Sequence, residues 1–212
     1  MPDAEWKKQR TPREIASEQK REKIYQCAVE LFREYGYDAI TVKDIAAKCS
    51  MSEGSIYNFF GTKYGILSGI RARIERETAS LIAPTEEHLA HPVDAVLAYL
   101  LAQGRFFEEL GVELTSKYYM NVPVTPDQIH SSGTLMISHR LERLRSFLTL
   151  SLETGRASSE MSADELSALF LTVCNGLLST WIFFSGAYSL EEVSETTLRT
   201  IVTTYYHDAT AK

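Results

Sequence analysis

The sequence lacks a hydrophobic run of the kind that spans a membrane, which takes about 18 or more apolar residues. The nearest is residues 169–186, "LFLTVCNGLLSTWIFFSG", where polar side chains intervene at Thr172, Asn175, Ser179 and Thr180. The first residues include lysine and arginine but not the apolar stretch of a secretory signal. We therefore expect a cytoplasmic protein that has no contact with a membrane.

Cysteine is scarce: Cys27, Cys49 and Cys174 lie far apart and none belongs to a CxxC pair, as is usual in a reducing cytoplasm. His88 and His91 have a spacing that suits metal ligation on a helix, but no third ligand accompanies them. A nucleophile paired with a base and a glycine-rich phosphate loop are also missing. We therefore expect no metal, no cofactor and no enzymatic activity.

Strand patterns are absent as well, because no run of alternating β-branched residues and no Asn-Gly hairpin turn occurs. Helix start signals recur instead, each a Ser or Thr followed three residues later by an acidic side chain. They begin at Thr11, Thr41 and Ser162. With 44% hydrophobic and 24% charged residues, a usual globular composition, the sequence predicts an all-α fold of about nine helices.

The predicted helices form two groups, which indicates two domains. The N-terminal domain, residues 1–62, contains a tail and a three-helix helix-turn-helix module. The C-terminal domain, residues 63–212, begins with a connecting helix at about 63–83 and a hinge at 84–92. The remaining helices are expected to begin at Pro92, near Leu135, after Ser162 and after Ser189; residues 111–133 are left open because Pro123, Pro126 and Gly133 interrupt them.

Charge is divided unevenly along the chain. Residues 1–80 contain 14 lysines and arginines against 12 acidic residues, whereas residues 81–212 contain 8 against 16. The net charge of −6 therefore combines a basic N-terminal part with an acidic body. This distribution is typical of a nucleic-acid-binding module attached to a different kind of domain.

Residues 36–67, "GYDAITVKDIAAKCSMSEGSIYNFFGTKYGIL", match the sequence pattern of a known family at many positions, without an insertion or a deletion. The matching positions are Gly36, Tyr37, Thr41, Val42, Asp44, Ile45, Ala46, Ser52, Gly54, Tyr57, Phe60, Lys63 and Leu67. In this segment the chain closely resembles the DNA-binding module of TetR-type (tetracycline-repressor-like) transcriptional regulators. Beyond it, only the helical pattern and the total length agree with the family.

Three positions depart from the family pattern. Ser50 replaces the glycine of the turn and is expected to adopt a left-handed or otherwise unfavourable backbone conformation, at some energetic cost. Cys49 stands where a small residue is usual. Phe59 stands where the family commonly has a His or Tyr that reaches a phosphate, and a phenyl ring cannot make that hydrogen bond.

The segment from Ser52 to Phe60 has the properties of a helix that reads DNA. On a helical wheel, Ile56 and Phe60 share the face that packs on the first helix, while Gly54 and Asn58 lie on the opposite face. An asparagine there can pair with adenine in the major groove, and groups at helix N-termini can hold phosphates. The predicted DNA-binding residues are Thr41, Ser52, Gly54, Ser55, Tyr57, Asn58, Phe59 and Lys63.

A structural interpretation of the same residues is also open. Thr41 and Ser52 would cap helices in any helix-turn-helix, and Tyr57 and Phe59 could be packing residues. The basic tail with Lys7, Lys8, Arg10 and Arg13 would add contacts to DNA that do not depend on sequence.

The helix that begins after Ser162 is apolar on two faces, so it must be covered from two sides. In the TetR-type family the last two helices form a dimer interface, and on that resemblance we expect a homodimer; packing within one chain is the alternative. The expected interface residues are Leu171, Leu178, Ile182, Ile201 and Tyr205.

Aromatic residues are dense in the body, and similar proteins bind small molecules between these helices. Most of these aromatic residues are expected to be core, but an apolar pocket with a few polar groups is the usual form of such a site. The candidate ligand-binding residues are Phe106, Tyr118, Tyr119, Asn175 and Trp181.

The resemblance therefore implies a ligand-responsive regulator, most simply a repressor. It would bind a palindromic operator in double-stranded DNA as a homodimer and leave it when a small, mostly apolar or aromatic effector binds. One alternative keeps DNA binding but makes the body a docking surface for a protein partner. Another is an all-helical enzyme in which the N-terminal module only packs.

Overall fold

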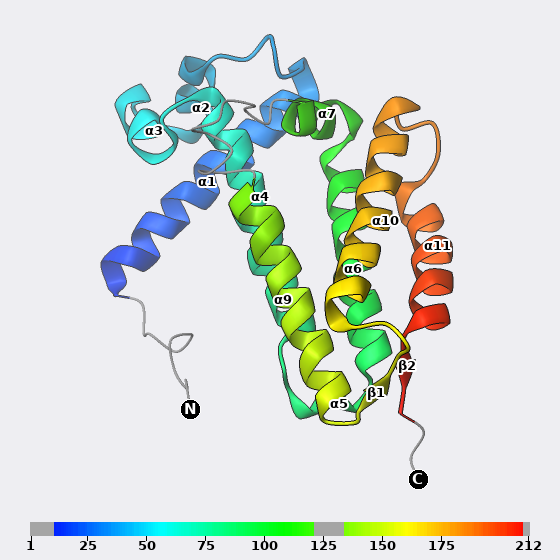
Figure 1. The fold of residues 1–212 in the computed structure, drawn as a ribbon. Coiled ribbons are helices and arrows are strands. Elements are labelled where there is room, and N and C mark those ends of the chain that lie inside the picture. Colours follow the sequence, from blue (N-terminus) through cyan, green and yellow to red (C-terminus); the bar gives the residue numbers. More distant parts are fainter. Residues whose placement is uncertain (1–10, 121–133, 210–212) are drawn as a thin grey trace. The chain divides into compact units, whose positions relative to one another are not determined.

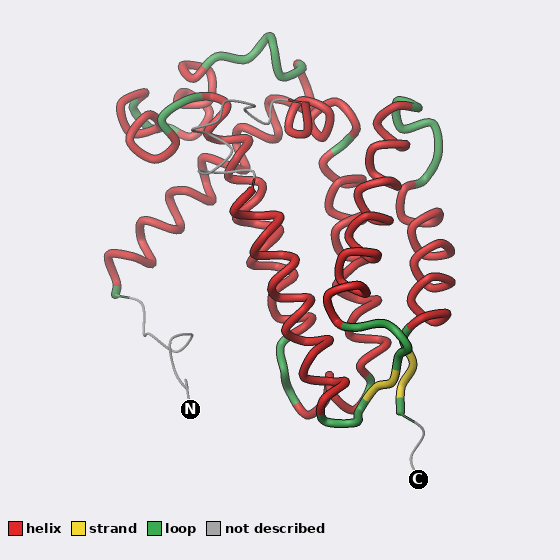
Figure 2. Tube along the Cα trace, in the orientation of Figure 1, coloured by secondary structure: helices red, strands yellow, loops and turns green. Residues whose placement is uncertain are grey.

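The computed structural model describes residues 11–120 and 134–209. Almost every regular element in these ranges is a helix, which confirms the all-α class (Figure 2). The exception is a short antiparallel pair of strands, β1 (Ala157–Ser158) and β2 (His207–Asp208). Each strand is only two residues long, so the pair leaves no sequence pattern from which it could be predicted.

The chain divides into two compact units, residues 1–70 and residues 71–212. Unit 1 contains α1 (Pro12–Tyr35), α2 (Val42–Cys49), α3 (Glu53–Phe60) and the first part of α4 (Lys63–Ala79). The division lies within α4, whereas the sequence places the domain boundary at the residue before this helix. The predicted module of three helices is thus present within unit 1.

Local capping explains where the helices of unit 1 begin. Thr11 and Thr41 each form a capping box, in which the hydroxyl oxygen accepts the N–H of the third helical residue and that residue's carboxylate accepts the cap's N–H. Ser52 caps α3 by accepting the N–H of Ser55. These bonds satisfy donors that a helix leaves unpaired at its first turn.

The core of unit 1 forms where the three helices meet. Its side chains are almost completely removed from solvent: Ile24, Ala28, Phe32, Ile45, Cys49 and Ile56. The ring of Tyr37 packs against that of Phe32, with 4.9 Å between centroids. The residues of α1 in this core, Ile24, Ala28 and Phe32, are spaced four apart and so lie on one face of the helix.

The turn between α2 and α3 has the backbone conformation that the sequence predicted. Ser50 has φ 56° and ψ 48°, which is the left-handed region. Its N–H donates to the carbonyls of Ala46 and Ala47, and this closes α2. A residue with a side chain is strained in this conformation, and glycine is not.

Unit 2 is a helical body. It contains the end of α4 and a series of further elements: η1 (Ser80–Ile82), α5 (Glu86–Ala90), α6 (Pro92–Leu110), α7 (Val112–Met120), α9 (Thr134–Glu153), α10 (Ala163–Phe183) and α11 (Leu190–Tyr205) (Figure 1). The short helix α5 occupies the predicted hinge. The helix α7 occupies part of the segment that the sequence left open, and residues 121–133 lie outside the described ranges.

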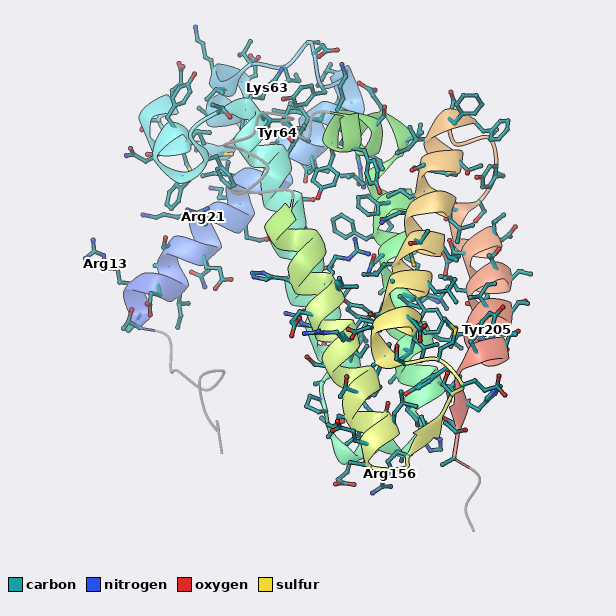
Figure 3. The ribbon with its side chains drawn as sticks, in the orientation of Figure 1. Arg13, Arg21, Lys63, Tyr64, Arg156 and Tyr205 are labelled. Atoms are coloured by element: carbon teal, nitrogen blue, oxygen red, sulfur yellow. The ribbon has the colours of Figure 1, made fainter. Side chains whose placement is uncertain are left out.

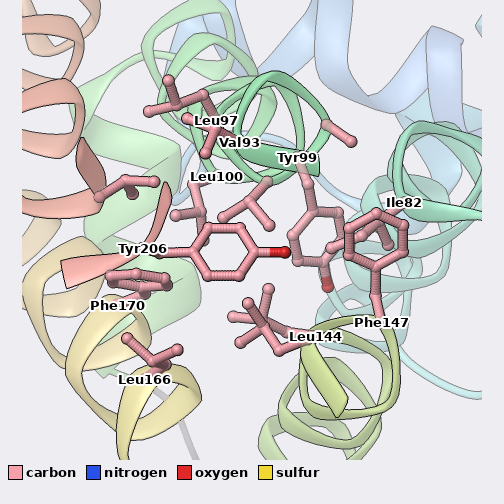
Figure 4. Packing of buried hydrophobic residues seen from close by; sticks show 14 of the residues in the cluster. Ile82, Val93, Leu97, Tyr99, Leu100, Leu144, Phe147, Leu166, Phe170 and Tyr206 are labelled. Carbon is pink, nitrogen blue, oxygen red and sulfur yellow. The ribbon is translucent and has the colours of Figure 1, made fainter. Parts of the chain in front are cut away.

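The core of unit 2 is centred on Tyr206, whose ring lies among leucine and phenylalanine side chains (Figure 4). Its hydroxyl lies 2.6 Å from Oγ of Ser151, which in turn donates to the carbonyl of Leu148. Burial raises the pKa of Tyr206 to about 12, so the phenol stays neutral. The adjacent Asp208 accepts the N–H of Val93 at the start of α6, so the strand β2 is fastened to the body.

Among the described residues, α10 is the one helix whose length and mean hydropathy would allow it to cross a membrane. A core helix of a soluble protein has the same properties. The buried residues Leu166, Phe170 and Leu171 place α10 in the core of unit 2. About one third of the most hydrophobic 18-residue stretch of α10 is buried inside the chain. The other side of the helix is therefore not covered by the described residues.

We predict that Ser50→Gly stabilises unit 1, because glycine adopts the left-handed conformation without a clash of its side chain. Relief of the backbone strain stabilises the folded state, whereas the greater conformational entropy of glycine stabilises the unfolded state. The net free energy of unfolding should rise by about 0.5–1 kcal/mol. Urea unfolding followed by circular dichroism measures the change. Ser50→Ala is the matched control and should bring no gain; an equal gain in both variants would contradict the explanation.

Candidate functional site

The helix α3 presents one face to the core and another to solvent. Ile56 is buried behind it, whereas Gly54, Tyr57 and Asn58 are exposed. The Tyr57 ring is half exposed, at 50%, which is unusual for a large aromatic side chain that has no partner surface. A Cβ at Gly54 would meet only Oγ of Ser52, at 4.0 Å, so this part of the helix can approach another molecule closely.

Two serines organise the N-terminal end of α3. Oγ of Ser52 accepts the N–H of Ser55 at 3.2 Å and lies 2.9 Å from Oγ of Ser55. The remaining first-turn N–H groups and the positive end of the helix dipole are therefore directed out of this end. An N-terminus of this kind attracts phosphate groups.

Thr41 caps α2. Its hydroxyl donates to Oδ2 of Asp44 at 2.5 Å and accepts the N–H of Asp44, while its own N–H donates to the same carboxylate at 2.8 Å. The hydrogen bonds from Thr41 lower the pKa of Asp44, so the carboxylate remains charged. The structure thus gives Thr41 a capping role, and its contact with DNA stays a prediction.

Lys63 at the start of α4 has partners within unit 1. Its Nζ donates to the backbone carbonyls of Tyr37 and Ile40, both at 2.7 Å. The same ammonium lies 4.2 Å from the centroid of the Tyr37 ring, within the range of a cation–π contact. Lys63 therefore ties the loop that precedes α2 to α4, a role that the sequence pattern did not indicate (Figure 3).

The guanidinium of Arg21 on α1 lies over the rings of both Phe59 and Phe60. The carbon Cζ of Arg21 is 5.6 Å from the centroid of Phe59 and 5.5 Å from that of Phe60. Phe59 thus has a packing role in place of the polar role that the family gives its position. Arg21 was absent from the predicted site, and no sequence pattern pointed to it.

Gly65 is a second residue that the sequence analysis did not select. A Cβ at this position would lie 1.8 Å from the carbonyl oxygen of Phe60, far inside any permitted contact. Glycine is therefore required where the end of α3 passes over the first turn of α4. The break in "FFGTKYG" was the only local sign of this approach.

The predicted dimer residues divide into two groups. Leu171 and Leu178 are buried within their own chain, at 6% exposure each, so they leave little surface for a second copy. Ile182 and Ile201 are partly buried, and Tyr205 is exposed. The two leucines are core residues of unit 2, because α10 turns that face toward its neighbouring helices.

The predicted ligand residues do not form one site. Tyr118 is buried, and Trp181 is buried with its Nε1 donating to the carbonyl of Tyr188. Phe106 packs edge to face on its neighbour Phe107. The Tyr119 hydroxyl does donate to Oδ1 of Asn175 at 3.1 Å, so this one predicted pair is brought together.

Asn175 also lines a cavity of about 20 Å³ inside unit 2, room for about one water molecule. Its other lining residues come from four helices: Leu100, Gln103, Gly104, Phe107, Arg140, Cys174, Leu178, Leu190, Ser194 and Leu198. Of the predicted ligand residues, only Asn175 belongs to this lining. In the described part of the chain, no group of three or more His, Cys, Asp or Glu side chains could hold a metal ion.

Comparison with known proteins finds a family whose model matches most of unit 1. Residues 24–70 match the family described as bacterial regulatory proteins, tetR family. The HTH-type transcriptional regulator HbdR of Aromatoleum sp. (strain CIB) is 34% identical over 94 residues. This match covers 41% of the present chain and 41% of that protein.

Two further matches extend over most of the chain. The HTH-type transcriptional repressor BepR of Brucella suis biovar 1 (strain 1330) is 24% identical over 181 residues, covering 80% of this chain and 84% of that one. The crystal structure of Thermus thermophilus FadR, a TetR family transcriptional repressor in complex with lauroyl-CoA, has a TM-score of 0.59 at 20% identity. It covers 86% of this chain and 93% of its own.

The family match spans the segment that holds Ile56 behind α3 and exposes Gly54 and Asn58. The structural match shows that the body has the fold of such regulators as well. Residues 24–70 therefore match the tetR family of bacterial regulatory proteins, and the chain as a whole is similar in sequence and fold to transcriptional regulators of this type.

Proposed function

We propose that the protein is a repressor that binds a palindromic operator as a homodimer and leaves it when a small effector occupies the body. The observation that carries the proposal is the outer face of α3. Its exposed residues Gly54, Tyr57 and Asn58 are not needed to hold the helix in place, because Ile56 is buried on the other side. Because this face of α3 does not pack against the rest of unit 1, it is available to bind DNA.

Asn58 is the residue we assign to base recognition. Its side chain is exposed near the middle of α3, and an asparagine amide can donate to N7 and accept from N6 of adenine at once. Gly54, one turn earlier on the same face, lets the helix backbone approach the groove. Ser52, Ser55 and the helix N-terminus would then contact the phosphates beside the groove.

A dimer is supported by an exposed stripe of small residues along α10. It consists of Ala168, Thr172, Gly176 and Ser179, and a Cβ placed at Gly176 would meet nothing within 4 Å in its own chain. Small residues allow two helices to pack at short distance. Phe183, at 82% exposure, lies one turn beyond the stripe and would be covered by the second copy.

The neighbouring helix α11 has a face suited to the same contact. Each of four exposed threonine hydroxyls donates to the carbonyl four residues earlier in the helix: Thr196, Thr200, Thr203 and Thr204. Because the hydroxyls are satisfied within the helix, burial of this face leaves none of them unpaired. Ile201 and Tyr205 would complete an interface of helices α10 and α11 from each protomer.

The effector proposal is supported by the body's fold and by its internal cavity. The Thermus thermophilus repressor with this fold is solved in complex with lauroyl-CoA. In the present chain, the cavity beside Asn175 is one place where polar side chains meet inside the body. Release from DNA requires that effector and operator prefer different conformations.

A second candidate function is DNA binding with a body that docks another protein. The exposed pair Phe183 and Phe184, whose rings are 5.3 Å apart between centroids, favours it, because adjacent exposed rings are common in protein interfaces. Genome-wide footprinting separates the candidates, since a local repressor occupies few sites and a chromosome-associated factor many.

Asn58→Ala is predicted to weaken binding to the preferred operator by about 1–3 kcal/mol and to relax the preference at one base pair per half-site. The operator is first defined by selection from random duplexes, and affinities are then measured for each single-base variant. Gln26→Ala, which removes an exposed amide on α1, is the control. Equal weakening on every operator variant would show that Asn58 does not read a base.

Lys63→Met is predicted to destabilise unit 1, because the Tyr37 and Ile40 carbonyls lose a charged donor. The expected loss in unfolding free energy is about 1.5–3 kcal/mol, measured by urea denaturation. Lys43→Met, at an exposed position on α2, is the matched control. A contact with DNA phosphate would instead leave the unfolding free energy unchanged. It would reduce the slope of log K for DNA binding against log salt concentration by about 1, the value for one lost phosphate contact, and this result would contradict the structural role.

Gly176→Arg is predicted to convert the dimer into a monomer. The arginine has open space around it in its own chain and improves helix propensity, so a clash arises only with a second copy. Light scattering after size exclusion should give the mass of one chain, 23.9 kDa, in place of two. Glu153→Arg, at an exposed position on α9, should remain dimeric; a dimer in both variants would refute the α10 interface.

A further inference from the structure

Two buried donors in the body have no partner. Within the described residues, neither Nε of Arg140 nor Nε2 of Gln103 has a hydrogen-bond acceptor. Gln103 is 4% exposed, and both side chains line the cavity in unit 2. Because unpaired buried donors are costly and uncommon in folded proteins, two at one cavity require an explanation.

The charge of the cavity is positive. Arg140 is the one charged residue in its lining, and none of the lining residues is acidic. Cys174 remains a neutral thiol, because burial raises its pKa to about 11. Burial raises the pKa of Cys174 and of Tyr119, and the nearby positive charge of Arg140 lowers both pKa values in part. A guanidinium held in this position lacks a counter-charge in the lining.

The polar groups of the lining are mainly donors. The Tyr119 hydroxyl donates to Oδ1 of Asn175, so the group that Asn175 still offers is its amide N–H₂. Ser194, on the opposite helix α11, adds a hydroxyl. A set of donors around a single cation suits a group that only accepts hydrogen bonds and carries a negative charge.

We propose that this cavity binds a carboxylate group, with Arg140 as its counter-charge and Gln103 as a second donor. A planar carboxylate matches the fork of a guanidinium, and one of its oxygens would occupy the space of about one water molecule that the cavity provides. The inference rests on the proposed function in one respect, that the carboxylate belongs to the effector. The rest of the effector exceeds this space, so its binding would require the helices that carry Leu100, Phe107 and Leu178 to move apart.

Acetate is the probe, because it carries the carboxylate and little else. The full chain labelled with ¹⁵N is titrated with sodium acetate at constant ionic strength, and the Nε–Hε signal of Arg140 is followed after assignment by its loss in Arg140→Met. Acetamide, sodium chloride and inorganic phosphate are titrated in the same way. We expect a saturable shift with acetate, at least tenfold tighter than with the other three; binding of acetamide or phosphate equal to that of acetate overturns the proposal.

Variants identify the residues that hold the anion. Arg140→Met and Gln103→Met should each weaken acetate binding at least tenfold. Arg145→Met is the control on the same helix, since its guanidinium pairs on the surface with Glu142. Acetate binding that survives in both cavity variants refutes the site.

The same variants separate a binding role from a structural one. Removal of a donor that has no partner should leave the melting temperature of the acetate-free protein unchanged or higher. A marked fall in both variants would mean that these groups stabilise the folded chain without a ligand, which contradicts the proposal. The two proposals can fail separately. If the protein binds acetate but not DNA, the proposed repressor is wrong and the carboxylate site stands. If it binds DNA but not acetate, the carboxylate site is wrong and the proposed repressor stands.

Discussion

The helix-turn-helix module depends on the side chains buried behind two very short helices. α2 and α3 contain eight residues each, and helices of this length do not persist in water by themselves. Ile45 and Ile56 are almost completely buried, and each such side chain contributes about 1.5–3 kcal/mol. Because this burial holds α3 from one side, Gly54 and Asn58 on the other side remain exposed and would be available for the proposed recognition of DNA.

Helix beginnings and the turn could be predicted from the sequence because they are decided over a few residues. The capping boxes at Thr11, Thr41 and Ser162 form between positions three apart. Ser50 takes its left-handed conformation because the chain must turn sharply between two helices. In each case the physical cause lies within one turn of the residue, where sequence spacing is a direct guide to distance.

Other features could not be predicted, because their partners are distant along the chain. Lys63 bonds carbonyls 23 and 26 residues away, and no spacing rule connects these positions. Gln103 and Arg140 approach one cavity from different helices. The burial of Leu171 within its own chain could not be predicted either. The helix α10 is apolar on two faces, and its sequence does not show which face packs in the core of the same chain. The short helices α5 and α7 had too few turns for a periodic pattern.

The threonine face of α11 has a consequence for how the protein assembles. Because Thr196, Thr200, Thr203 and Thr204 satisfy their hydroxyls within the helix, the face tolerates water and burial alike. In the proposed homodimer, a separated protomer would then be a stable species, and pairing would be a reversible equilibrium governed by concentration. In the proposed repressor, occupancy of the operator would rise with the square of the protomer concentration at low expression. Repression would then set in sharply as the protein accumulates in the cell.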